Sequence, residues 1–234
     1  MQRMTLQPLQ CQKMLARARI AVLAMVLSVL AGCATTNTKV EQKPAAVPTG
    51  PSVARLVDGR EGFTITEPNQ MDAESRRDFE RAVTMMQDED YDKAIELLEK
   101  VMEQSPGVTA PYIDIAMAYE HVDKLKEAEK SLKTALELIP DHPVASNEYG
   151  LLLRKTGRFT EARTIYEKTL AAFPEYLPAH RNLGILCDLY LDDPQCALEQ
   201  YEIYSKAVPE DKQVKIWIAD LRLRLKDHKS DNSK

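Results

Sequence analysis

Residues 109–140 read TAPYIDIAMAYEHVDKLKEAEKSLKTALELIP. Apolar side chains recur at helical spacing in each half of this stretch, and a short polar segment separates the halves. Ala116 and Ala128 are small, as is needed where two antiparallel helices approach closely, and larger residues fill the space around them. The stretch therefore predicts a helix-turn-helix unit that closes at Pro140.

The same unit recurs along the chain. Four prolines that close successive units are separated by 34, 34 and 35 residues: Pro106, Pro140, Pro174 and Pro209. A fixed period of this length is typical of a solenoid, in which stacked units bury a continuous core. The predicted fold is all-α, with residues 71–209 forming four helix-turn-helix repeats at about 75–106, 109–140, 143–174 and 177–209.

These repeats resemble the tetratricopeptide repeat (TPR) family, whose period is 34 residues. The second repeat carries the family's markers at Tyr112, Ile115, Ala116, Tyr119, Ala128, Leu132, Ala135 and Pro140. The third and fourth carry theirs at Tyr149, Gly150, Leu153, Ala162, Tyr166, Leu183, Gly184, Ala197 and Tyr201. The first repeat is the least faithful, as suits a terminal unit that has one face in water.

After the last repeat, residues 210–226 place apolar side chains on one helical stripe. We expect a C-terminal capping helix here, covering the fourth repeat. Residues 227–234 are polar, and we expect a disordered tail.

The N-terminus reads as an export signal over residues 1–32, with basic residues before an apolar run at 20–30. The run ends in Leu30-Ala31-Gly32-Cys33, which resembles the lipobox of bacterial lipoproteins. That resemblance implies lipidation of Cys33, with palmitate among the acyl chains. Because Ala34 rather than Asp follows the cysteine, it also implies the outer membrane, facing the periplasm. The alternative is an ordinary secretory signal with a chance cysteine.

Residues 33–70 are predicted to be a flexible tether, because they contain several prolines and few large apolar residues. Within them, residues 62–66 either form a strand or pack on the first repeat, and the sequence leaves both alternatives open.

Charge argues against nucleic acid as a partner. Loss of residues 1–32 removes four basic residues and leaves 27 Lys and Arg against 36 Asp and Glu, a formal charge of −9. A chain this acidic is a poor ligand for a phosphate backbone.

The sequence also predicts no enzyme, no cofactor and no metal site. The four histidines are scattered, and no phosphate-binding glycine loop or nucleophile elbow is present. Cys187 and Cys196 lie across the turn of the fourth repeat and would be level in an antiparallel hairpin. They form either a disulfide or two separately buried thiols.

The first helices of stacked repeats line a concave groove, where partners usually bind. Val83, Met117, Leu151 and Ile185 recur at 34-residue intervals and are predicted to form its apolar floor. The same geometry places Phe79, Ile113, Asn147, Arg154, Arg181 and Asn182 around that floor. The alternative is that the apolar row only packs between neighbouring helices.

The predicted function is a membrane-anchored adaptor that binds peptide or helix segments of other envelope proteins. The chain resembles TPR lipoproteins that assist pilus or secretion assembly and, less specifically, those encoded with energy-coupled transport systems. A scaffold for cell-wall enzymes is the alternative, and an unrecognised enzyme is the third class of function. The sequence carries no signal of oligomeric state.

Overall fold

The structure, a computed structural model, describes residues 52–56, 62–67 and 69–231. The helices are α2 (Ala73–Gln87), α3 (Tyr91–Gln104), α4 (Thr109–His121), α5 (Leu125–Leu138), α6 (Pro143–Lys155), α7 (Phe159–Ala172), α8 (Leu177–Leu189), α9 (Pro194–Ala207) and α10 (Lys212–Asp231). Two short strands, β1 (Ser52–Arg55) and β2 (Phe63–Thr66), precede them. The predicted signal peptide and Cys33 lie outside the described residues.

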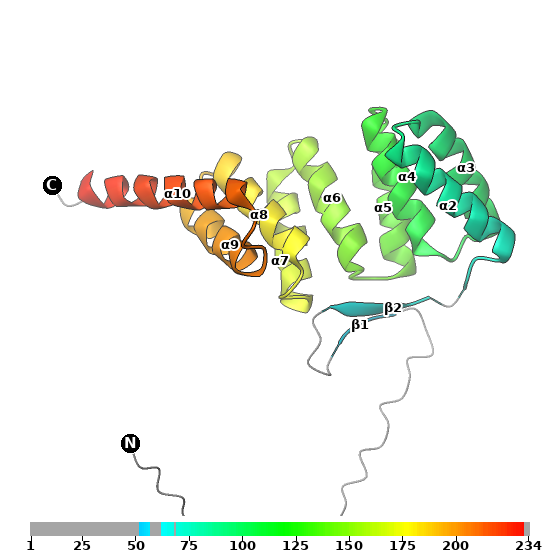
Figure 1. Cartoon of the computed structure of the whole chain (residues 1–234), viewed down its shortest axis with the longest axis horizontal. Helices are drawn as coiled ribbons and strands as arrows, with labels where there is room; N and C mark the ends of the chain where they lie inside the picture. The colour runs from blue at the N-terminus through cyan, green and yellow to red at the C-terminus, as the bar shows by residue number, and fades with distance from the viewer. Residues whose placement is uncertain (1–51, 57–61, 68, 232–234) are drawn as a thin grey trace, which may run out of the picture. The chain divides into compact units, whose positions relative to one another are not determined.

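Consecutive helices pack in pairs, α2 with α3, α4 with α5, α6 with α7 and α8 with α9. The pairs stack in chain order, and the first helices α2, α4, α6 and α8 are neighbours along one side (Figure 1). This arrangement confirms the predicted all-α repeat fold with a terminal helix.

Small residues mark the crossing points inside each pair. Ala82, Ala116, Ala128, Ala162 and Ala197 are completely buried. Because no side chain beyond Cβ separates the helices there, larger side chains from the partner helix can lie across them. The repeat spacing thus places one tight crossing in every unit.

The turn inside each repeat ends the first helix with a residue in the left-handed region. Glu89, Asp123 and Gly157 have φ of 61°, 59° and 77°, at 34-residue intervals. In the fourth repeat Asp192 takes this role with φ 50°, one residue later than the spacing requires. The extra residue in the 35-residue spacing between Pro174 and Pro209 therefore lies in this turn.

The two strands pair antiparallel, with Ser52 opposite Thr66 and Arg55 opposite Phe63. The Phe63 ring packs edge-on against Phe173 and Tyr176, at 5.7 and 5.8 Å between centroids. Residues 63–66 therefore form a strand, which packs against Phe173 at the end of the third repeat, while Ile65 also lines a hollow beside α2 of the first repeat. Part of the predicted flexible tether, 33–70, is ordered by this contact.

The terminal helix is longer than predicted. It begins after Asp211, whose carboxylate accepts the backbone N–H groups of Gln213 and Val214. It runs to Asp231 and so includes five residues assigned to the disordered tail. Extending an existing helix needs no new nucleus, so a polar continuation is compatible with helix.

Within the described residues, no helix is both long enough and apolar enough to cross a bilayer.

Candidate functional site

The face formed by α2, α4, α6 and α8, here called the groove, carries one apolar residue per repeat. Met117 is 36% exposed, and Val83, Leu151 and Ile185 are half-buried. None of the four belongs to the buried core. Part of each side chain therefore remains exposed on this face, although Ile185 also packs against the core.

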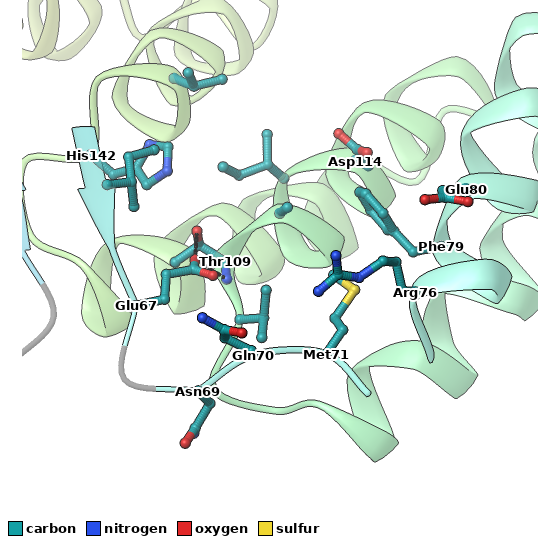
Figure 2. A pocket seen from close by; sticks show the side chains of 15 residues that line it. Glu67, Asn69, Gln70, Met71, Arg76, Phe79, Glu80, Thr109, Asp114 and His142 are labelled. Carbon is teal, nitrogen blue, oxygen red and sulfur yellow. Dashed lines mark hydrogen bonds between the residues drawn. The ribbon is translucent and has the colours of Figure 1, made fainter. Parts of the chain in front are cut away.

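A first hollow of about 660 Å³ lies at one end of the groove (Figure 2). Helices α2, α4 and α6 supply one part of its lining, and residues 65–71 supply the other. Glu67 fixes that segment, since its carboxylate accepts the backbone N–H of Thr109 at 2.7 Å and the Thr109 hydroxyl. This contact also satisfies a free N–H at the start of α4.

The lining of the first hollow is apolar with charged edges. Apolar contacts come from Ile65, Met71, Phe79, Val108, Ile113 and Val144. Charged groups at its edges are Glu67, Arg76, Glu80 and Asp114, and Figure 2 shows them on several elements around one space. An apolar pocket with a few polar groups is the usual form of a binding site.

A second hollow of about 390 Å³ lies farther along the groove. It is lined by Met117, Glu120, His121, Glu148, Leu151, Arg154, Lys155 and Tyr190. The Arg154 guanidinium lies over the Tyr190 ring at 5.9 Å, and its Nη1 is buried without a hydrogen-bond partner among the residues that the structure describes. Because Arg154 lines the hollow, its guanidinium is a donor group for a ligand carbonyl or carboxylate.

Carboxylates follow the apolar row at the same repeat spacing. Glu80, Asp114 and Glu148 are 34 residues apart on α2, α4 and α6. Burial, and then the negative charge of Glu148, raise the pKa of Asp114 to about 6. Burial also raises the pKa of Glu148, while a hydrogen bond from Asn147 acts in the opposite direction. The groove is thus acidic beside its apolar floor.

Three residues predicted at the groove surface lie beneath it. Ile113, Asn147 and Asn182 are only 4%, 3% and 9% exposed. The Asn182 amide donates to the Asn147 carbonyl oxygen at 3.0 Å, and the Asn147 amide donates to Glu148 at 2.9 Å. These two hydrogen bonds connect Asn182 through Asn147 to Glu148, so buried polar atoms of both asparagines are satisfied.

The remaining predicted groove residues are half-buried. Phe79 lines the first hollow, and the Arg181 guanidinium lies over the Trp217 ring of α10 at 5.6 Å. Arg181 is therefore already engaged by the terminal helix, at the α8 end of the groove.

Sequence reasoning missed the contribution of Glu67 and Met71 to the site. Both precede the first repeat, so no 34-residue register marks them. It also missed His142, whose Nδ1 accepts the backbone N–H of Ala145 at the start of α6. Burial lowers the pKa of His142, which keeps the ring neutral and able to accept.

Cys187 and Cys196 are joined by a disulfide, with Cα atoms 6.0 Å apart. The structure therefore has the disulfide and not two separately buried thiols. Among the described residues, the one cluster with metal-ligand atoms is Cys187, Asp193 and Cys196. Its thiols are consumed by the bond, so the cluster offers no thiolate to a metal.

Comparison with known proteins identifies the repeat. A family model described as Tetratricopeptide repeat matches residues 85–147 and 122–183. A curated relative, the probable UDP-N-acetylglucosamine–peptide N-acetylglucosaminyltransferase SPINDLY of Petunia hybrida, is 29% identical over 93 residues. The match covers 40% of this chain, which spans only 10% of that relative.

Three known structures share the fold at low sequence identity. The pilF protein of Pseudomonas aeruginosa has a TM-score of 0.60 at 21% identity, covering 65% of this chain and 69% of that one. MamA (41-end) from Desulfovibrio magneticus RS-1 gives 0.58 at 19% identity, with 69% and 90% covered. A thermophilic TPR protein of Thermus thermophilus gives 0.57 at 19%, with 64% and 81% covered.

Such solenoids bind other proteins along their extended surfaces. The family match over residues 85–183 shows that the chain contains tetratricopeptide repeats, and the structural neighbours share this repeat fold.

Proposed function

We propose that this protein is a membrane-anchored adaptor that recruits or stabilises components of a cell-envelope machine for pilus assembly, secretion or energy-coupled transport. Its groove would hold a peptide or helical segment of an envelope protein. The observation that carries the proposal is the row Val83, Met117, Leu151 and Ile185, which stays at the surface along four stacked helices.

The two hollows give such a segment places to anchor. Apolar side chains of the partner would enter the spaces beside Phe79 and Met117. The Arg154 guanidinium would fix the direction of the bound chain by donating to its carbonyl or carboxylate oxygens. A few such anchors supply most of the binding free energy in protein interfaces.

The membrane part of the proposal comes from the N-terminal sequence. Cys33 follows the lipobox-like Leu30-Ala31-Gly32, and two or three acyl chains on one cysteine would hold the protein stably on a bilayer. The likeness to pilF of Pseudomonas aeruginosa concerns the fold alone. The choice among pilus, secretion and transport machines therefore rests on the sequence resemblance to TPR lipoproteins.

Site-specific photocrosslinking in intact cells tests the groove. A photoreactive amino acid at Met117 or Leu151 should form crosslinks to an envelope protein. The same amino acid at Thr164, an exposed residue of the second helix α7, is the control. Crosslinking at position 164 but at neither groove position would place partner binding elsewhere and overturn the groove assignment.

Metabolic labelling with a fatty-acid analogue tests the anchor. The label should enter the wild-type protein and be absent from Cys33→Ser. Equal labelling of both chains would show that Cys33 is not the acceptor.

A further inference from the structure

The last helix of the solenoid presents apolar side chains to solvent. On its inner side, α10 buries Val214 and Leu221 completely against the repeats. On the opposite side, Ile216 and Leu223 are each 61% exposed. These two residues are seven apart, so they lie on one face of the helix, with exposed Ala219 between them. A terminal cap normally has a polar outer face, so this one departs from its expected role.

The same face is strongly basic. Its exposed or partly exposed cations are Lys212, Lys215, Arg222 and Lys226. Asp220 is the one acidic residue between positions 212 and 226, and its carboxylate pairs with Arg224 at 2.9 Å. Among the described residues, no carboxylate lies within ion-pair distance of Lys212 or Lys215. This positive charge stands out in a chain whose formal charge is −5.

We propose that this face of α10, defined by Ile216, Ala219 and Leu223 with the flanking lysines, docks on an anionic phospholipid surface. An amphipathic helix of this kind lies parallel to a bilayer, with apolar side chains among the acyl chains and lysines at the lipid phosphates. Each lysine near an anionic leaflet raises the affinity about fivefold. The inference concerns a surface separate from the groove and does not depend on what the groove binds.

Charge decides against a second copy of this chain as the occupant. Two α10 helices packed through the same face would bring Lys215, Arg222 and their neighbours into a shared interface. The Arg222 guanidinium is already paired with Glu202 of α9 at 2.7 Å, so that carboxylate is not free to neutralise the lysines. An anionic surface supplies the missing counter-charge.

Docking would add a second contact to the proposed lipid at Cys33. One lipid anchor alone leaves a protein free to rotate, whereas a basic patch together with acyl chains fixes one face against the membrane. The groove residues Met117 and Leu151 lie on α4 and α6, whereas the proposed docking face is on α10.

Spin-label accessibility measures the contact directly. The full-length protein, carrying a nitroxide on Ala219→Cys, is extracted from membranes and reconstituted into vesicles. In vesicles containing phosphatidylglycerol, collisions with a water-soluble nickel complex should fall and collisions with oxygen should rise, relative to pure phosphatidylcholine. A nitroxide on Thr164→Cys should report the same values in both kinds of vesicle.

Two charge reversals of equal size separate the α10 face from net charge. Lys212→Glu with Lys215→Glu should lower the ratio of protected to exposed label at position 219 by at least about 25-fold. Both sites are exposed, and acidic residues suit the first turn of a helix, so the fold should persist. Lys126→Glu with Lys130→Glu on α5 changes the net charge equally and should leave protection intact. Equal exposure of the 219 label in both lipids, or equal loss in both variants, would overturn the proposal.

Discussion

The Tyr166 ring of α7 lies directly against the Cα of Gly150 on α6. A Cβ at position 150 would be 2.6 Å from two of the ring carbons, closer than real atoms approach. The fourth repeat repeats this relationship with Gly184 and Tyr201, at 2.5 Å. In the second repeat the equivalent residues are Ala116 and Leu132. The first helix therefore carries glycine where the second helix carries tyrosine, and alanine where the second helix carries the smaller leucine.

Gly150→Ala should therefore destabilise the protein, by about 1 to 2 kcal/mol. Overpacking costs about 1 to 3 kcal/mol, and the better helix propensity of alanine returns about 0.5 to 1. Denaturant unfolding measures the change. Gly150→Ala with Tyr166→Leu recreates the pair of the second repeat, and it should lose less stability than the two single variants added together. Strict additivity would mean that the ring does not set the residue at position 150.

Met117 and Ile115 lie on the same helix but should respond differently to truncation. Met117→Ser should change the free energy of unfolding by less than about 1 kcal/mol, because the side chain is at the surface. Ile115→Ala should cost about 2 to 5 kcal/mol, because Ile115 is completely buried. Thermal melts of both variants, with partner crosslinking measured in parallel, compare them. A collapsed melt for Met117→Ser would assign the apolar row to the core.

Asp114 should make the protein less stable as the pH rises. Its pKa is about 6 in the folded state, above the ordinary value of 3.8, so the folded chain holds this proton more tightly than the unfolded chain. Stability from Asp114 is therefore fully present below about pH 4 and is lost as the pH rises through about 6. Asp114→Asn should be more stable than the wild type at neutral pH, on the order of 1 kcal/mol for a partly solvated group.

Unfolding curves of the wild type and Asp114→Asn at acidic and neutral pH test this sign. Near pH 4 the two proteins should differ little. A stability difference of the same size at both pH values would show that the carboxylate charge is not its cause.

The Cys187–Cys196 disulfide should stabilise the fourth repeat. Closing so short a loop is worth about 2 to 3 kcal/mol through the unfolded state. Cys187→Ser with Cys196→Ser should lower stability by at least this amount, and the loss should vanish when both proteins are compared under reducing conditions, apart from the cost of a buried hydroxyl at position 187. Intact-mass analysis with and without reductant establishes the bond, and two free thiols in unreduced protein would contradict it.

The 34-residue period made it possible to predict the helix pairs and the apolar row from the sequence, but not features that depend on contacts between repeats. Proline spacing located the helix pairs, and counting 34 residues from Val83 located Met117 and Leu151 on the groove. The same counting cannot tell Asn147 from a surface residue, because its burial depends on its amide bond to Asn182 from the next repeat. The exposure of such a side chain depends on its contacts with the neighbouring repeat.

Features outside the period were harder to predict. The strand that contains Phe63 packs against Phe173, which is over a hundred residues away in the sequence. No local sequence pattern predicts that contact. The last turns of α10 carry polar residues typical of a tail, yet they continue a helix that is already formed.

The strand pair β1–β2, which packs against the third repeat, adds a long-range folding step to the local folding of the repeats. Most contacts in the solenoid join neighbouring helices, a low contact order that favours folding in microseconds to milliseconds. The ion pair between Arg55 and Glu175 instead closes a loop of 120 residues. That closure gains nothing until residues 173–176 are in place, so we expect the hairpin to attach last. The repeats would then fold while the strands β1 and β2 are still free, and attachment of the strand pair would mark the completed third repeat.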